Sequence, residues 1–270
     1  MIVDGRKLEV VRIGARDDTR PTFVMLHEGL GSVALWKDFP AQLAARTGCG
    51  VVVYSRYGYG ESDVFAEPRD VDYMHHEAQV VLPALLRDLQ IERPILFGHS
   101  DGASIALIYA ARAPQAPLAL ILEAPHVFVE DLSIASIASA KVAFESTDLP
   151  QKLARYHTDP TATFRGWNDI WLDPRFRDWN IEALLPKITS PVLVIQGRED
   201  TYGTAKHVRA IERAVPGTSS ELLDACGHSP HRDQAAPVLA AVSTFFSKHF
   251  DSAHLASEGG RPASRRTTSM

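Results

Sequence analysis

The pentapeptide Gly98-His99-Ser100-Asp101-Gly102 constrains the fold of this chain more than any other short segment. It stands between residues 94–97, an apolar run that predicts a buried strand, and residues 101–112, whose apolar spacing predicts a helix. A strand that turns sharply into a helix needs small residues beside the turn and exposes the central side chain above the sheet. The free N–H groups and positive dipole end of the helix lie next to that side chain. The sequence therefore predicts Ser100 as a nucleophile, with a serine that only caps the helix as the alternative.

Apolar runs alternate with helical segments along most of the chain. Runs that are apolar on both faces are typical of parallel strands covered by helices on both sides of a sheet. The sequence therefore predicts the α/β class, with a mostly parallel sheet flanked by helices. The predicted strands are 22–26, 51–54, 94–97, 118–122, 192–195 and 221–223. The predicted helices are 33–47, 77–89, 101–112, 204–214 and 235–250, and Asp4-Gly5 predicts a hairpin near the first residue.

The alternation of strands and helices stops between about residues 127 and 187. This stretch has no clear strand, and it holds an aromatic cluster of Phe164, Trp167, Trp171, Phe176 and Trp179. We predict a helical cap at 127–187, inserted after the sixth strand into an α/β core formed by 1–126 and 188–251. Residues 252–270 are rich in Ser, Gly, Arg and Thr and offer little to bury, so we expect a disordered tail there.

The composition is that of an ordinary globular protein. The 270 residues are 45% hydrophobic and 23% charged, which suits a single α/β unit without stabilising crosslinks. The net charge of −5 and the absence of a basic stripe predict neither nucleic acid nor a membrane as a partner. Two cysteines cannot form a disulfide framework, and the first residues lack the apolar run of a signal peptide, so we expect a cytoplasmic location. The oligomeric state stays open.

Two further side chains are suited to activate Ser100. A serine hydroxyl needs a base within hydrogen-bond distance, and the base needs an acid that orients it. Asp200 follows one predicted strand, and His228 follows the next. Side chains just beyond the carboxyl ends of parallel strands meet at the same edge of the sheet. We therefore predict His228 as the base and Asp200 as the acid, with Glu123 at another strand end as the alternative acid.

Several segments together resemble the α/β-hydrolase superfamily, especially its cap-bearing small-molecule esterases, lactonases and C–C hydrolases. They extend from about Phe23 to Phe246 and comprise 27–32, 55–62, 98–102, 196–200 and 227–230. The order serine, acid, histidine along the chain is the order of that superfamily. The resemblance implies a hydrolase without a cofactor. It also implies an oxyanion hole made by the N–H of Asp101, the residue after the nucleophile, and by an N–H from the loop 27–32.

One residue departs from the pattern of the superfamily, whose members usually carry His-Gly where this chain has His27-Glu28. The length of the loop up to Trp36 still matches. In that register the second oxyanion donor is the N–H of Gly29, with Leu30 as the alternative. A Glu28 carboxylate that points inward would repel anionic substrates or act as an extra base. The interpretation that we favour is a carboxylate that points outward as a surface charge.

The remaining candidates concern the substrate pocket and metal binding. His75-His76 and the spacing of His228 and His231 could suggest a metal, but no third ligand follows a recognised pattern, so we expect none. No dinucleotide-binding fingerprint follows the first strand. For the tryptophans of the inserted segment, a small core of that segment is an equal alternative to a pocket wall. The predicted pocket residues are Glu28, Leu30, His99, His126, Trp167 and Trp171.

These features predict an enzyme that cleaves a small carboxylic ester or lactone through an acyl-enzyme. The alternatives are a C–C bond hydrolase of a ring-cleavage product, a cofactor-free perhydrolase, and a ligand sensor on a hydrolase scaffold. Haloalkane dehalogenases and epoxide hydrolases of the superfamily carry Asp at the position of Ser100, so this chain does not fit them.

Overall fold

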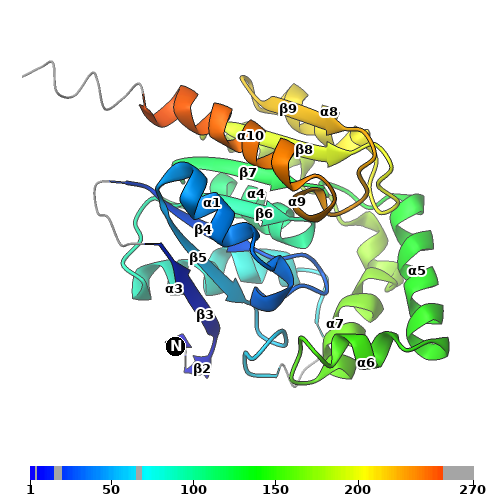
Figure 1. Ribbon diagram of the computed structural model, residues 1–270. Helices are drawn as coiled ribbons and strands as arrows, with labels where there is room; N and C mark the ends of the chain where they lie inside the picture. Colours follow the sequence, from blue (N-terminus) through cyan, green and yellow to red (C-terminus); the bar gives the residue numbers. More distant parts are fainter. Residues whose placement is uncertain (4, 15–19, 65–68, 252–270) are drawn as a thin grey trace, which may run out of the picture.

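The computed structural model describes residues 1–3, 5–14, 20–64 and 69–251, and a seven-stranded sheet forms its centre (Figure 1). The strand order across the sheet is β3-β5-β4-β6-β7-β8-β9. Neighbouring strands run parallel except at the edge, where β3 is antiparallel to β5. The predicted α/β class with a mostly parallel sheet is therefore confirmed. The strands are β3 (Glu9–Ile13), β4 (Thr22–Leu26), β5 (Gly50–Ser55), β6 (Ile95–His99), β7 (Ala119–Glu123), β8 (Val192–Gly197) and β9 (Ser219–Leu223).

Helices cover both faces of the sheet. On one face, Phe23 and Met25 of β4 pack with α1 (Phe39–Thr47) and α10 (Ala235–Phe246). Val24 and Leu26 of β4 point to the other face and belong to the larger of the two hydrophobic cores. That core includes α3 (Leu82–Asp88), α4 (Asp101–Arg112) and α8 (Ala205–Ala214). Successive side chains of a strand point to opposite faces, so a strand covered on both sides has to be apolar throughout.

The first residues form the predicted hairpin. The strand β1 (Ile2–Val3) pairs antiparallel with β2 (Arg6–Lys7). Gly5 in the turn has φ +77°, a conformation that glycine adopts at little cost. Asp4, the other half of the turn signal, lies outside the described residues.

The predicted helices 33–47 and 77–89 differ from their observed forms. The predicted helix 33–47 is divided into η1 (Val33–Trp36) and α1, because Lys37 between them has φ 54°. Where the helix 77–89 was predicted, the observed helical region begins earlier, at Tyr73. It consists of α2 (Tyr73–His76), η2 (Glu77–Val81) and α3, which follow one another directly. The middle piece is a π-helical turn. The ring of Pro83 prevents a regular α-turn there, because it has no N–H and would collide with the carbonyl four residues earlier.

Helices without a strand of their own fill the chain between β7 and β8, apart from one isolated bridge between Phe128 and Asn180. They lie together at one end of the sheet (Figure 1). This inserted segment follows β7, the strand predicted at 118–122. Its elements are α5 (Asp131–Ser146), α6 (Leu149–Leu153), α7 (Pro160–Trp171), η3 (Pro174–Asp178) and η4 (Glu182–Lys187).

The last described elements are α9 (Pro230–Asp233), α10 and the π-helical turn η5 (Ser247–Asp251). The expected tail, 252–270, lies outside the described residues. Within the described part of the chain, no helix is both long enough and apolar enough to cross a membrane.

Candidate active site

The turn between β6 and α4 holds Ser100 in an unusual backbone conformation. Its φ is 53° and its ψ is −115°, outside the regions that non-glycine residues normally occupy. A Cβ on Gly98 would lie 2.4 Å from the carbonyl oxygen of Gly102, and one on Gly102 would lie 2.1 Å from that of Leu26. The two glycines are therefore required by close packing of this turn against neighbouring backbone. The turn presents the serine side chain at the carboxyl end of the sheet.

Hydrogen bonds join Ser100, His228 and Asp200 in one chain. The Nε2 atom of His228 lies 2.9 Å from Oγ of Ser100. The Nδ1 atom of the same ring lies 2.8 and 2.9 Å from the two carboxylate oxygens of Asp200. Asp200 follows β8 and His228 follows β9, so two parallel strands bring these side chains to the same edge of the sheet.

The loop after β8 fixes the carboxylate of Asp200. The side-chain amide of Gln196 donates to Oδ2 at 2.6 Å, and the backbone N–H groups of Tyr202 and Gly203 donate to Oδ1 at 2.8 and 3.3 Å. Burial alone would raise the pKa of Asp200. The hydrogen bond and charge of His228, together with the two N–H donors, outweigh burial and lower that pKa. The carboxylate is therefore ionised and points at one ring nitrogen.

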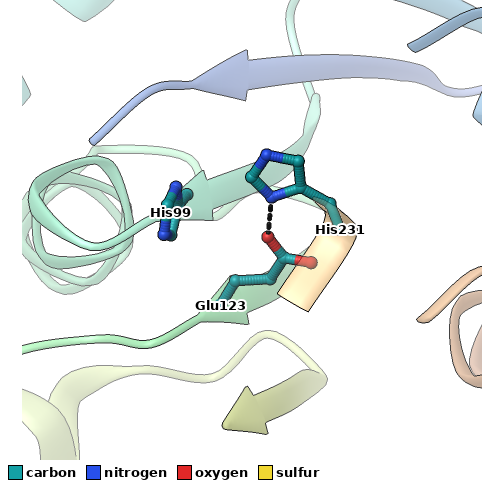
Figure 2. Close-up of side chains that lie close together, drawn as sticks. All are labelled: His99, Glu123 and His231. Atoms are coloured by element: carbon teal, nitrogen blue, oxygen red, sulfur yellow. Dashed lines mark hydrogen bonds and ion pairs between the residues drawn. The ribbon is translucent and has the colours of Figure 1, made fainter. Parts of the chain in front are cut away.

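Glu123, the alternative acid, binds a different histidine. It ends β7, and its Oε2 accepts a hydrogen bond of 2.6 Å from Nδ1 of His231 in α9. Figure 2 shows this pair beside His99, and all three side chains are buried. One ligand atom of each lies within 4.8 Å of the others, so within the described part of the chain these three residues could hold a metal. Sequence spacing missed the group because its members come from three separate segments.

The hydrogen bond between Glu123 and His231 gives each of these two side chains a partner within the protein. Such pairing is the usual way in which a buried acid and a buried histidine are satisfied.

A buried arginine fixes the loop after β4. The guanidinium of Arg56 donates to the carbonyl oxygen of Glu28 at 2.8 Å, and the same oxygen accepts from Nδ1 of His27 at 2.7 Å. The backbone N–H of Arg56 donates to the other nitrogen of that ring at 3.0 Å. Sequence reasoning gave Arg56 no role, although it lies within the segment 55–62 that carries the family resemblance.

A second buried network holds the side chain of Asp101. The hydroxyl of Tyr73 donates to its Oδ2 at 2.7 Å, and Arg56 lies 3.6 Å from the same oxygen. The indole N–H of Trp171 donates to the Tyr73 hydroxyl at 3.1 Å. Tyr73 thus links Asp101, the residue after Ser100, to the inserted segment. The sequence gave no reason to select Tyr73.

A cavity of about 220 Å³ opens beside Ser100 and His228. Residues of the sheet end and residues of the inserted segment both contribute to its wall. Most of the predicted pocket and oxyanion residues line it, namely Glu28, Gly29, Leu30, Asp101, His126, Trp167 and Trp171. The sequence missed four others, Ile137, Tyr202, Ser229 and Arg232.

His99, also predicted to line the pocket, does not. It is 1% exposed, and its Nε2–H donates to the carbonyl oxygen of His228 at 2.6 Å, so it lies beneath the cavity wall. Its Nδ1 is 3.5 Å from the carboxylate of Glu28. Glu28 itself lines the cavity with its carboxylate against this buried imidazole, so the favoured expectation that it points outward as a surface charge is wrong.

Some aromatic residues of the inserted segment line the cavity, and others form a small core of the segment itself. Trp167 and Trp171 line the cavity. The Phe164 ring stacks on Phe144 with ring centroids 4.0 Å apart, and Phe176 stacks on Trp179 at 5.5 Å. The latter four rings form packing contacts within the segment.

His126 lies in the cavity wall as a neutral ring. Burial, followed by the nearby imidazoles of His207 and His228, lowers its pKa well below the usual value. Its ring centroid is 5.0 Å from that of Trp171. The cavity therefore combines aromatic walls with an uncharged imidazole and one carboxylate at Glu28.

Comparisons with known proteins concern the family and the fold of this chain. A model of the alpha/beta hydrolase family matches residues 23–241. The sn-1-specific diacylglycerol lipase ABHD11 of Mus musculus is 25% identical over 85% of this chain and 82% of its own. A proline iminopeptidase of Lactobacillus helveticus is 23% identical over 88% and 93% of the two chains. The solved enol-lactonase of Burkholderia xenovorans LB400 superposes with a TM-score of 0.73 at 21% identity, covering 91% of this chain and 98% of that one, which shows similarity of fold.

Proposed function

The chain belongs to the alpha/beta hydrolase family, and on that premise we propose that it is a serine hydrolase with Ser100 as its nucleophile. The observation that carries the proposal is the unbroken hydrogen-bonded chain from Ser100 through His228 to Asp200. A serine hydroxyl beside an imidazole that is itself oriented by a carboxylate is the arrangement that acyl transfer requires.

The proposed reaction has two halves. Oγ of Ser100 attacks the substrate carbonyl while Nε2 of His228 takes the hydroxyl proton. The tetrahedral intermediate then collapses, the carbonyl–oxygen bond to the leaving group breaks, and His228 returns the proton to the departing oxygen. Water attacks the resulting acyl-enzyme with the same base, which releases the acid and restores Ser100. Asp200 holds the ring in the tautomer that accepts at Nε2 and stabilises the imidazolium.

The oxyanion hole is assigned to the N–H groups of Asp101 and Gly29. Asp101 begins α4, and the first N–H groups of a helix have no acceptor within it. The carbonyl of Glu28 points toward Arg56 and His27. Because a trans peptide is planar, the N–H of Gly29 in the same peptide unit points the opposite way, away from those two residues. Both donor residues line the cavity.

The proposed substrate is a small carboxylic ester or lactone. A cavity of about 220 Å³ with tryptophan walls suits a short acyl group. One relative is named a diacylglycerol lipase and one structurally similar protein an enol-lactonase, and both names fit a substrate of this class. We further propose that 127–187 is a cap over a core of 1–126 and 188–251. A cytoplasmic location stays a prediction from the sequence.

The experiment that tests the proposal is hydrolysis of p-nitrophenyl esters from acetate to decanoate by the wild type and by Ser100→Ala. We expect the variant to lose about 10³-fold or more in kcat/KM. The preferred chain length then gives the size of the acyl pocket. If neither protein hydrolyses any ester, the esterase function fails, and C–C hydrolysis, perhydrolysis or ligand sensing takes its place. Equal rates in both proteins would remove Ser100 from the mechanism.

A further inference from the structure

We propose that Glu28 makes this active site select substrates by charge, accepting acyl groups with a cationic or neutral end and rejecting anionic ones. The inference rests on the proposed serine-hydrolase function and names the substrate class for that site. It concerns the one residue of the loop 27–32 that departs from the usual His-Gly pattern.

The carboxylate of Glu28 occupies a defined place in the cavity wall. Its side chain is 27% exposed and lines the same cavity as Ser100. A Cβ on Gly31 would lie 2.2 Å from Oε2 of Glu28, so the side chain folds back over that glycine. The next residue in the chain, Gly29, carries a proposed oxyanion donor. A substrate carbonyl bound at Ser100 would therefore have this carboxylate as a close neighbour.

His99 keeps the carboxylate ionised. Its Nδ1 lies 3.5 Å from Oε2 of Glu28, and its ring is buried. Burial raises the pKa of Glu28, but the nearby imidazole of His99 outweighs it and holds that pKa well below its usual range. Glu28 in turn raises the pKa of His99 against the effect of burial on that ring. The pair thus favours a carboxylate facing the cavity and a proton on the ring behind it.

The protonated ring of His99 behind Glu28 explains how a carboxylate can lie next to an oxyanion hole. An isolated negative charge there would oppose the oxyanion as it forms. The Nε2–H of His99 is held by the carbonyl oxygen of His228, so a second proton on the ring would lie at Nδ1, toward Glu28. The positive ring offsets the carboxylate at longer range, whereas a substrate group inside the cavity meets the carboxylate first.

The other charged residues of the cavity wall have weaker effects. The carboxylate of Asp101 is bound from behind by Tyr73 and Arg56. Arg232 is 71% exposed, and its guanidinium lies 3.5 Å from Asp233, so solvent and that acid both screen it. Among the described wall residues, Glu28 therefore decides that the electrostatic potential around a bound acyl group is negative.

The test uses three p-nitrophenyl esters that differ in the charge at the end of the acyl chain. They are the neutral butanoate, the anionic hemisuccinate and the cationic trimethylammoniobutanoate. In the wild type we expect kcat/KM to fall from the cationic through the neutral to the anionic ester. In Glu28→Gln and in Glu28→Gly we expect the cation-to-anion ratio to fall by roughly tenfold or more, as loss of a nearby charge predicts. The ratio does not depend on how much of a variant folds.

Arg232→Gln is the matched control, because it removes one charge from the same wall. It should change the ratio in the opposite direction and by less. A ratio that stays within about twofold of the wild type in both Glu28 variants overturns the proposal. So does a wild type that prefers the anionic ester.

A second measurement separates this proposal from the proposed function. p-Nitrophenyl phosphonates with the same three end groups would label Ser100 without turnover, and their labelling rates should give the same order. If the labelling rates fall from the cationic to the anionic phosphonate but no ester is hydrolysed, the esterase function is refuted and the proposed selection by charge stands. Labelling in another order overturns the charge selection, and no labelling of Ser100 overturns both.

Discussion

The carboxylate of Glu123 and the imidazole of His231 are joined by a hydrogen bond of 2.6 Å, which commits the acid at the end of β7 to a histidine other than the proposed base. Asp200→Asn should therefore lower kcat by about 10⁴-fold, because the amide no longer holds the required tautomer of His228. Glu123→Gln should keep kcat within about tenfold and lower the free energy of unfolding by about 1–3 kcal/mol. Steady-state kinetics and urea unfolding of both variants give the comparison. A larger loss of kcat in Glu123→Gln would reassign the acid.

The loops that carry Asp200 and His228 pack against each other at Gly197. A Cβ there would lie 2.2 Å from the carbonyl oxygens of both Cys226 and Gly227, which are backbone atoms that cannot move aside alone. Gly197→Ala should shift the His228 loop, cost about 1–3 kcal/mol in stability and lower kcat more than it raises KM.

Gly166→Ala in α7 is the control for that substitution. Its added Cβ would meet the flexible side chain of Arg69 at 3.3 Å, and alanine should gain about 0.5–1 kcal/mol over glycine within a helix. Thermal unfolding and ester kinetics measure both variants. Wild-type kcat in Gly197→Ala would mean that the loops tolerate the shift.

The hydroxyl of Tyr73 links the inserted segment to the residue after Ser100. It donates to Asp101 and accepts from Trp171, so Tyr73→Phe leaves two buried polar groups without this partner. We expect a loss of about 1–3 kcal/mol in stability.

Trp171→Phe combined with Tyr73→Phe gives a double-mutant cycle for this link. The combined loss should be smaller than the sum of the single losses by about 0.5 kcal/mol or more, because both substitutions break the same hydrogen bond. Additive losses, measured by chemical denaturation, would show that the two groups do not interact.

Glu130 gives the protein a pH-dependent contact between the inserted segment and α8. It accepts from the backbone N–H and the hydroxyl of Thr204 and lies 3.0 Å from Nε2 of His207. Burial raises its pKa, but the neighbouring imidazole of His207 and the two hydrogen bonds from Thr204 lower it to about 2. A pKa lowered by folding stabilises the folded state above the usual pKa of a glutamate, and the contribution is lost as the pH falls from about 4.5 toward 2.

Glu130→Gln should therefore lower the Tm at pH 7 by roughly 2–4 °C for each kcal/mol that the contact contributes. The difference from the wild type should shrink as the pH falls and disappear near pH 2. Differential scanning calorimetry across this range tests it. A Tm difference that is constant with pH would assign the effect to packing and not to the charge.

The sequence by itself determined the sheet, the turn at Ser100 and the identities of His228 and Asp200 as candidates. These features depend on local patterns. A strand that is apolar on both faces has to be covered by helices, and side chains just after such strands have to meet at one edge of the sheet. The α4 helix was predicted with the bounds that it has, because its apolar spacing begins directly after the turn. Even so, the breaks at Lys37 and before Pro83 were missed, because each is a departure within an otherwise helical pattern.

Only the tertiary structure decided how the polar side chains pair. Glu28 faces the cavity because His99, from another strand end, lies behind it, and no local signal gives that direction. Arg56 and Tyr73 gain their roles from partners many residues away in the chain. A buried polar group takes the partner that packing brings within about 3 Å, and packing is a property of the whole fold. The sequence names the residues that can do chemistry, and the three-dimensional arrangement selects which of them meet.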